Sequence, residues 1–105
     1  MRYKAHRSGE KNNVRTYYED FSVIARRSGL TVDTSTASVT SGNSVSIASQ
    51  AYSQDLDSLA YQISFNTPGK SVVTLTTTFV GSDEKDVRSY HYTVIDNSLP
   101  LQDYQ

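Results

Sequence analysis

The sequence predicts an all-β fold, an immunoglobulin-like β-sandwich, and three observations support this class. Tyr, Ser, Thr and Val dominate the composition, and these residue types favour strands and turns over helices. Short segments in which apolar and polar residues alternate recur at roughly 8–12-residue intervals, with turn residues between them. The chain of 105 residues has the length of one domain, which can bury a modest core but not a deep catalytic cleft as well.

The strongest strand signals lie in residues 58–95, where we expect three strands. Apolar or aromatic residues alternate with polar ones through 58–66 and on both sides of a polar loop at 81–86, and a Pro-Gly turn lies at 66–70. The positions expected to face the core are Leu59, Tyr61, Ile63, Phe65, Val73, Leu75, Thr77, Phe79, Tyr90, Tyr92 and Val94. The positions expected to form an outer surface that lies against another subunit are Thr74, Thr76, Thr78, Arg88 and His91.

The middle of the chain gives weaker strand signals. A strand that begins at Leu30 is expected to break near residues 33–35 and to resume before the turn at 41–43. The alternating pair Val45 and Ile47 predicts the next strand, and residues 48–57 are either turn-rich or an edge strand.

One short helix is expected before these strands. Residues 14–18 alternate as a short strand does, and one or two helical turns are predicted from Phe21 to Arg27. Asp20 is a possible N-cap of this helix, and Gly29 would end it.

The charge of the chain is divided between its two ends. Residues 1–30 carry seven Lys or Arg against three acids, a net +4, and residues 31–105 carry three against eight, a net −5. Residues 1–13 lack periodicity, so we expect an extended basic N-terminal arm there, a β-sandwich domain over 14–95 and a short C-terminal tail over 96–105. A chain with a basic N-terminal part and an acidic remainder could bind three kinds of partner: nucleic acid, an acidic protein surface, or a neighbouring copy of the same chain.

The residues offer little support for catalysis or for a cofactor. There is no Cys, and His6 and His91 are the only histidines, whereas a metal site needs at least three converging ligands. The acids at 83–86 lack the spacing of a calcium loop, and the Lys-Ser pair in 67–71 lacks the glycine pattern of a phosphate loop. We therefore expect no enzyme, no metal and no cofactor. No apolar stretch follows Met1, so we expect neither a signal peptide nor a membrane span.

Aromatic and cationic residues lie close together near the N-terminus. Tyr17 and Tyr18 neighbour Arg15, and Arg26 and Arg27 follow shortly after. The simplest interpretation is that one Tyr packs inward while the other remains at the rim. Tyr and Arg are also enriched in protein interfaces. Stacking on single-stranded bases is a third interpretation, which the net charge of −1 disfavours.

Three segments of the chain, YYEDFS at 17–22, TVDTSTASVTSG at 31–42 and the hairpin at 69–94, follow one another in a recognisable order. Through them most of the chain resembles the fiber-tail adaptor family of small tailed-bacteriophage virion proteins, in which a few basic residues near the Met precede a D-x-x-x-D-[WF]-S segment. The run TVDTSTASVTSG at 31–42 follows the family's next segment, and 69–94 has the outline of its closing hairpin. The chain departs from the pattern where Phe21 and Ala37 replace the usual Trp and where residues 81–86 lengthen the hairpin loop.

The resemblance implies an immunoglobulin-like fold and a non-catalytic connector role. The chain would then join the phage tail to fibres or spikes, in several copies that contact one another in a ring, and would assemble into the virion in the bacterial host cytoplasm. We expect its partners to be other virion proteins and its own copies, with no nucleic acid and no membrane. The residues expected to bind these partners are Arg2, Lys4, Arg7, Lys11, Arg15, Tyr17, Arg26, Arg27, Asp83, Glu84, Lys85 and Arg88.

Two other functions are compatible with the same residues. A capsid decoration (cement) protein needs only adhesive surfaces on a β-sandwich, as an adaptor does. A carbohydrate-binding β-sandwich would use exposed Tyr side chains to stack on sugar, and Tyr52 and Tyr61 are the candidates.

Overall fold

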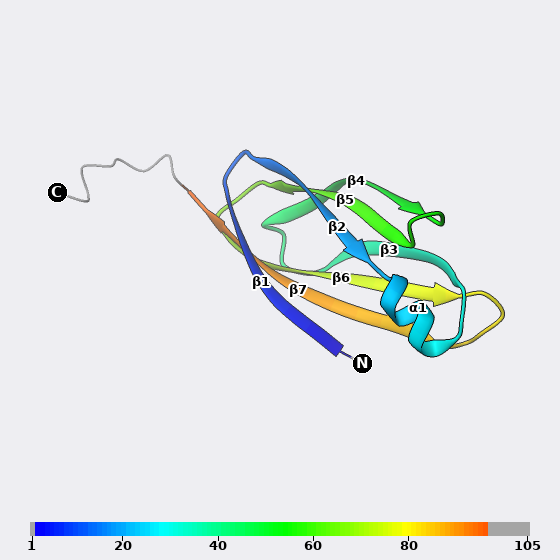
Figure 1. Cartoon of the computed structure of the whole chain (residues 1–105). Coiled ribbons are helices and arrows are strands. Elements are labelled where there is room, and N and C mark those ends of the chain that lie inside the picture. The colour runs from blue at the N-terminus through cyan, green and yellow to red at the C-terminus, as the bar shows by residue number, and fades with distance from the viewer. Residues whose placement is uncertain (1, 97–105) are drawn as a thin grey trace.

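A computed structural model describes residues 2–96, with side chains from residue 5 onward, and shows two β-sheets and one short helix (Figure 1). The elements are β1 Arg2–Glu10, β2 Val14–Asp20, α1 Ser22–Ser28, β3 Val32–Ser41, β4 Val45–Ser53, β5 Ser58–Phe65, β6 Gly69–Phe79 and β7 Lys85–Ile95. The predicted all-β class is confirmed.

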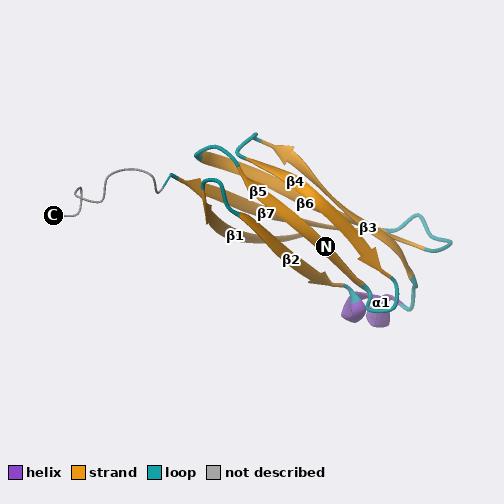
Figure 2. Ribbon diagram, turned by 90° about the horizontal axis from the view of Figure 1, so that it is seen from above, coloured by secondary structure: helices purple, strands orange, loops and turns teal. Residues whose placement is uncertain are grey.

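The two sheets have different strand orders and lie over one another. Four strands form one sheet in the order β1-β7-β6-β3, and three form the other in the order β2-β5-β4. β1 runs parallel to β7, whereas β3, β6 and β7 in one sheet and β2, β5 and β4 in the other pair antiparallel. Figure 2 shows the two layers from above, with α1 at one end of them. We call this end, with the loops at 54–57 and 80–84, the helix end.

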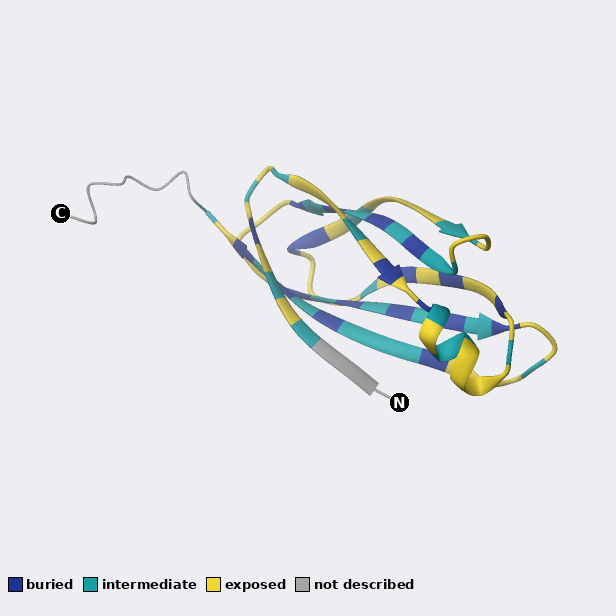
Figure 3. Ribbon diagram, in the orientation of Figure 1, coloured by how far each residue is buried: buried dark blue, intermediate teal, exposed yellow. Residues whose placement is uncertain are grey.

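The core lies between the sheets, and period-two alternation places its residues there. Every second residue of β5 is buried, and the buried positions of β6 and β7 also alternate, as Figure 3 shows. All the inward positions predicted for 58–95 are buried. The buried apolar residues are Phe21, Val32, Ala37, Val45, Leu59, Tyr61, Ile63, Phe65, Val73, Leu75, Phe79, Tyr90, Tyr92 and Val94.

One predicted boundary needs correction. Residues 2–10 are extended, as expected, but they are not an arm separate from the two sheets, because β1 pairs with β7 over its whole length. Gly9 is buried, and a Cβ atom there would lie 2.5 Å from the Phe65 ring, so the strand packs directly on the other sheet. This pairing could not be predicted, because residues 2–10 have almost no apolar alternation. Residues 97–105 of the predicted tail lie outside the described residues.

The predicted helix is present, with its cap displaced by one residue. α1 ends at Gly29, whose positive φ of 71° suits a glycine and whose N–H donates to the Ala25 carbonyl at 3.1 Å. The N-cap position falls on Phe21 rather than on Asp20. The Asp20 carboxylate still accepts the Ser22 N–H at 2.8 Å, so it satisfies one of the free donors of the first turn.

The strands in the middle of the chain are longer than predicted. β3 continues through residues 33–35, and the expected break is a register shift between Val32 and Thr34. β4 extends to Ser53 and lies at the edge of the three-stranded sheet. Of the two alternatives for residues 48–57, the edge strand is therefore correct for residues 48–53.

A side-chain amide joins the two sheets where β3 and β4 meet. The Gln50 Oε1 accepts the Ala37 N–H at 2.8 Å, and its Nε2 donates to the Ala37 carbonyl at 3.0 Å. These two bonds imitate the pairing of a neighbouring strand and satisfy backbone groups at the edge of β3. The two sheets are therefore linked by backbone-like hydrogen bonds along β3 and β4. Along β1 and β2 they are linked by side chains, which are described below.

Candidate functional site

The basic N-terminal region forms one side of the domain. β1 is an edge strand of the four-stranded sheet, β2 is an edge strand of the three-stranded sheet, and α1 follows β2 at the helix end (Figure 1). We call β1, β2 and α1 together the basic side. Its polar residues divide into those that join the two sheets and those that face outward.

Arg7 of β1 lies between the sheets inside a cage of tyrosines. Its Nη1 donates to the hydroxyl oxygens of Tyr61 at 2.6 Å and of Tyr92 at 2.8 Å, which belong to different sheets. Its guanidinium carbon lies 4.3 Å from the ring centre of Tyr17 and 4.1 Å from that of Tyr90. We call Tyr17, Tyr61, Tyr90 and Tyr92 the tyrosine cage. Arg7 and Tyr17 were expected to bind a partner, but here they bind their own domain.

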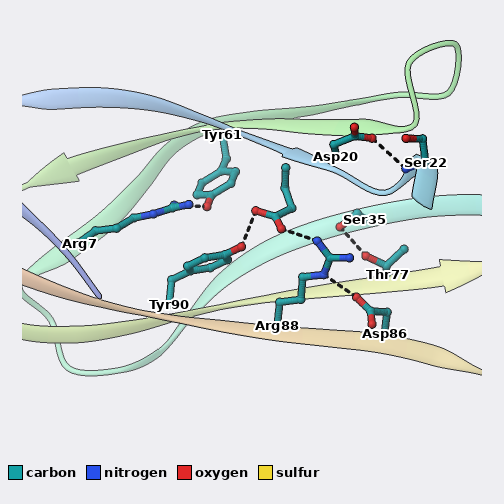
Figure 4. A network of polar contacts seen from close by, with 10 residues as sticks. Arg7, Asp20, Ser22, Ser35, Tyr61, Thr77, Asp86, Arg88 and Tyr90 are labelled. Atoms are coloured by element: carbon teal, nitrogen blue, oxygen red, sulfur yellow. Dashed lines mark hydrogen bonds and ion pairs between the residues drawn. The ribbon is translucent and has the colours of Figure 1, made fainter. Parts of the chain in front are cut away.

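A second half-buried cation, Arg88, lies nearer the helix end. The Arg88 guanidinium forms ion pairs with the Glu19 carboxylate and, at 2.9 Å from Nε to Oδ2, with Asp86 (Figure 4). The Tyr90 hydroxyl donates to the other Glu19 oxygen at 2.5 Å, and the Phe21 ring lies 4.7 Å from the guanidinium carbon. Glu19 and Asp86 are only 8% and 4% exposed. The network thus links β2, β7 and the start of α1.

The prediction that Arg88 lies on the outer face is wrong. Arg88 is two residues from both Asp86 and Tyr90, which are buried, so its side chain belongs to the inner face of β7. Strand parity in the sequence could have revealed this. The same parity correctly placed His91 on the outer face, where its ring lies 5.1 Å from that of His6.

The pKa shifts in this network keep its charges fixed. Burial raises the pKa of Tyr90, and the neighbouring Glu19 carboxylate raises it further. Burial also raises the pKa of Tyr92. Burial acts to lower the pKa of Arg88, but the hydrogen bonds to Glu19 and Asp86 outweigh that effect and the pKa is raised. These groups keep one protonation state over the neutral range, which suits a structural network rather than proton transfer.

The other predicted contact residues lie on the surface, although not in one patch. Arg15, Arg26 and Arg27 are exposed, and none of them has an ion pair with the side chains of residues 5–96. Arg26 and Arg27 lie in the last turn of α1 at the helix end. Asp83, Glu84 and Lys85 are exposed at the same end, whereas Lys11 is half-buried in the loop between β1 and β2. The backbones of Arg2 and Lys4 lie in β1, and their side chains are outside the described part.

The region of β3, β4 and the loop at 54–57 is acidic, and it reaches the helix end, where the Phe21 N–H donates to the Asp57 carbonyl at 2.7 Å. Residues 28–69 contain no Lys or Arg and three Asp, namely Asp33, Asp55 and Asp57. Asp33 and Asp55 lie on an open hollow of about 520 Å³ beside β3 and β4, together with Tyr52. Burial and then Asp57 raise the pKa of Tyr52 to about 12, so this hydroxyl stays neutral. We call this region the acidic side. The absence of basic residues over 28–69 is the sequence signal that marks it.

The structure changes which tyrosines are available to a sugar. Tyr61 is 1% exposed, and Tyr52 is half-buried, so neither presents a free ring face. Tyr18 is 73% exposed on the outer face of the three-stranded sheet, opposite Ala60. Among residues 2–96, no three His, Cys, Asp or Glu side chains are grouped as metal ligands, and no helix there is long and apolar enough to span a membrane.

Comparison with known proteins identifies a fold but no family. No family model and no curated protein matches the sequence. The chain is similar in structure to the Listeria monocytogenes internalin-like protein lmo2027 (15% identity, TM-score 0.54) and to InlP of the same bacterium (11%, 0.55). In both comparisons 90% of this chain is covered, but it spans only 30% and 26% of those chains. A third similar structure is the cysteine protease inhibitor EhICP2 of Entamoeba histolytica, at 8% identity and a TM-score of 0.53, with 90% and 93% of the two chains covered. At these identities the likeness extends to the all-β fold alone.

Proposed function

We propose that this chain is a non-enzymatic structural protein of a tailed-bacteriophage virion, an adaptor that joins the tail to fibres or spikes. Its fold would be immunoglobulin-like, and it would assemble into particles in the host bacterial cytoplasm. The resemblance of residues 17–22, 31–42 and 69–94 to the adaptor family suggests the role. The observation that carries the proposal is the uneven placement of exposed charge, with Arg15, Arg26 and Arg27 on the basic side and Asp33 and Asp55 on the acidic side of one small domain.

The two sides suit contacts between neighbouring copies. Exposed Arg15, Arg26 and Arg27 of one copy would face Asp33 and Asp55 of the next. Because the two surfaces differ, the contact is heterologous and closes into a ring when the rotation allows it. Each exposed ion pair contributes at most about 1 kcal/mol, so several must act together. Salt would screen such contacts.

A charge-reversal series tests the contact between copies. Arg26→Glu with Arg27→Glu should weaken self-association at low salt, measured by sedimentation velocity over a range of concentrations. Adding a second chain that carries Asp33→Lys and Asp55→Lys should restore mixed assemblies. Lys70→Glu, an exposed charge change in β6 on the outer face of the four-stranded sheet, is the matched control and should leave association unchanged. If the wild type, the charge-reversed variants and the control associate equally, copies do not contact one another through these charged residues.

The position of the protein in particles tests the role itself. A tag fused after Gln105 in the phage that encodes this chain can be located by labelled electron microscopy of purified virions. Label at the junction of tail and fibres supports the adaptor role. Label over the capsid supports the alternative, a decoration protein, and particles without the chain would remove both.

The carbohydrate-binding alternative now rests on Tyr18. This ring is exposed on the outer face of the three-stranded sheet beside Ala60 and Gln62, with Asp20 two residues further along the same face. Aromatic rings and amides of this kind suit the apolar faces and hydroxyl groups of sugars. A glycan array probed with the wild-type chain and with Tyr18→Ala separates this function from the adaptor role, which predicts no binding by either.

A further inference from the structure

We propose that β1 is exchanged between copies, so that β1 of one copy lies beside β7 of another in the place that it occupies here. This inference rests on the proposed function, because it describes how neighbouring copies of the adaptor are joined. The position of β1, its attachments and its link to β2 support it.

The apolar side chains of the core come almost entirely from outside β1. The buried apolar residues belong to β3, β4, β5, β6, β7 and the residue that precedes α1, and in residues 5–10 of β1 only the Ala5 side chain and the backbone at Gly9 pack against this core. β1 is also an edge strand, so removing it interrupts no pairing between other strands. Most of the hydrophobic free energy of folding therefore belongs to residues 14–95, which can form the two sheets while β1 is elsewhere.

The place that β1 occupies recognises its sequence closely. Backbone pairing with β7 extends from Arg2 to Glu10 and would accept many extended segments. The tyrosine cage adds a requirement for a cation at the position of Arg7, held by two hydroxyl groups and two ring faces. The Phe65 ring adds a requirement for glycine two residues later, because a Cβ at Gly9 would lie 2.5 Å from it. A strand with Arg and Gly at this spacing is what a second copy supplies.

The link between β1 and β2 is short and holds one residue in a left-handed conformation. Only residues 11–13 connect the two strands, although the strands belong to different sheets. Asn12 has a φ of 75°, in the left-handed region that Asn tolerates better than most residues but that only glycine adopts without cost. The turn is closed by the Asn13 N–H, which donates to the Glu10 carbonyl at 3.1 Å. Short hinge loops under strain favour domain swapping, since opening the hinge relieves the strain while the exchanged strand regains its contacts.

A second copy is favoured over an unrelated strand by concentration as well as by fit. In a ring of neighbouring copies the local concentration of β1 is high, which lowers the advantage that the tether gives to β1 of the same chain. Nine residues of extended strand span about 30 Å, enough to reach across the edge of an adjacent domain of this size. Isolated chains at low concentration keep β1 in place, and crowded chains exchange it.

Single-cysteine variants test the exchange directly, because the natural chain has no Cys. His6 and His91 are register partners on the outer face of β1 and β7, outside the tyrosine cage. His6→Cys and His91→Cys chains are mixed, unfolded, refolded together at high concentration and oxidised, and the products are separated on a non-reducing gel. Exchange predicts a disulfide between the two different chains, about ten-fold more abundant than for collisional controls, because it places the two thiols side by side.

The matched control pairs His6→Cys with Thr36→Cys, which lies on the same sheet in β3, two strands away from β7. A chain with both His6→Cys and His91→Cys reports the closed form, in which the disulfide forms within one chain. If the double variant oxidises within single chains at every concentration and the mixture gives no more product than the control, β1 is not exchanged.

Two variants of the link between β1 and β2 should change the yield of the disulfide between chains in opposite directions. Asn12→Gly removes the strain at positive φ and should lower the disulfide between chains several-fold. Deleting Asn12 leaves too few residues for the turn and should raise it several-fold. No change in either variant would contradict the role of the hinge. These measurements use the purified chain alone. If the strand is exchanged but the chain is not incorporated into virions, the exchange of β1 is supported and the adaptor role is contradicted.

Discussion

The space between the two sheets has two halves that are built differently. The half enclosed by β3, β4, β5 and β6 is filled by aliphatic and Phe side chains such as Ile63, Leu75 and Phe79. The half between β1, β2 and β7 holds two guanidinium groups, two carboxylates and the tyrosine cage. The difference indicates separate tasks. The apolar half supplies non-directional burial, and the polar half fixes which strand lies where, because its bonds form in one arrangement only.

The largest expected effect comes from the apolar half. Leu75 is fully buried near the middle of β6, so Leu75→Ala removes apolar contacts and leaves a cavity. We expect the free energy of unfolding to fall by about 3 kcal/mol, measured by urea denaturation. Thr76→Ala, on the outer face of the same strand, is the control and should change it by less than about 0.5 kcal/mol. A small effect of Leu75→Ala would mean that the core is not held by these contacts.

The next effect comes from the polar half, at Glu19. Glu19→Ala removes an ion-pair partner of the half-buried Arg88 and an acceptor of the Tyr90 hydroxyl. We expect a loss of about 2 kcal/mol, chiefly from the partial desolvation of a charge that keeps only Asp86. Glu19→Gln retains an oxygen acceptor and should lose less. Equal losses in the two variants would show that the charge of Glu19 alone matters.

The same comparison explains how far the sequence predicts the structure. The alternation through β5, β6 and β7 revealed the apolar half, since Leu59, Ile63 and Val73 have no reason other than burial to recur at every second position. The polar half was hidden, because Arg7, Tyr17 and Arg88 are residue types that the sequence indicates as surface contacts. Strand parity was enough to place Arg88 inside.

Arg7 could not have been placed inside from the sequence. Residues 2–10 contain Tyr3 and Ala5 as their only apolar or aromatic side chains, so no periodicity marks a strand there. The partners of Arg7 are far away in the sequence, 54 residues away at Tyr61 and 85 at Tyr92. Only the pairing of β1 with β7 brings them together, and parallel pairing between the two ends of a domain leaves no local signal.

A third effect appears at alkaline pH. Tyr90 and Tyr92 have raised pKa values in the folded state, chiefly because they are buried, whereas unfolded Tyr ionises near pH 10. Their contribution to stability is complete below that pH and is lost as the pH rises toward the folded-state pKa values, because the unfolded chain then releases protons that the folded chain keeps. We expect the free energy of unfolding to be about 2 kcal/mol lower near pH 11 than near pH 9.

Denaturation by urea at a series of pH values measures how steeply the free energy of unfolding declines with pH. Tyr92→Phe removes one of the two groups and should make the decline shallower. Leu75→Ala, which changes only the apolar half, should lower the whole curve without altering its slope. If the plots of unfolding free energy against pH are parallel for the wild type, Tyr92→Phe and Leu75→Ala, the buried tyrosines do not titrate on unfolding as the structure requires.

The smallest effect lies outside both halves, at the start of α1. The Asp20 carboxylate accepts the Ser22 N–H at 2.8 Å, and this hydrogen bond holds the pKa of Asp20 below its usual range. Asp20→Ala should destabilise the protein by about 0.5–1 kcal/mol through the loss of this hydrogen bond. Asp20→Asn keeps the oxygen acceptor and should retain most of the stability at neutral pH, so a loss equal to that of Ala would assign the effect to charge. Since the helix carries Arg26 and Arg27, fraying of α1 in Asp20→Ala should also weaken self-association, a readout that Leu75→Ala would leave unchanged as long as the chain remains folded.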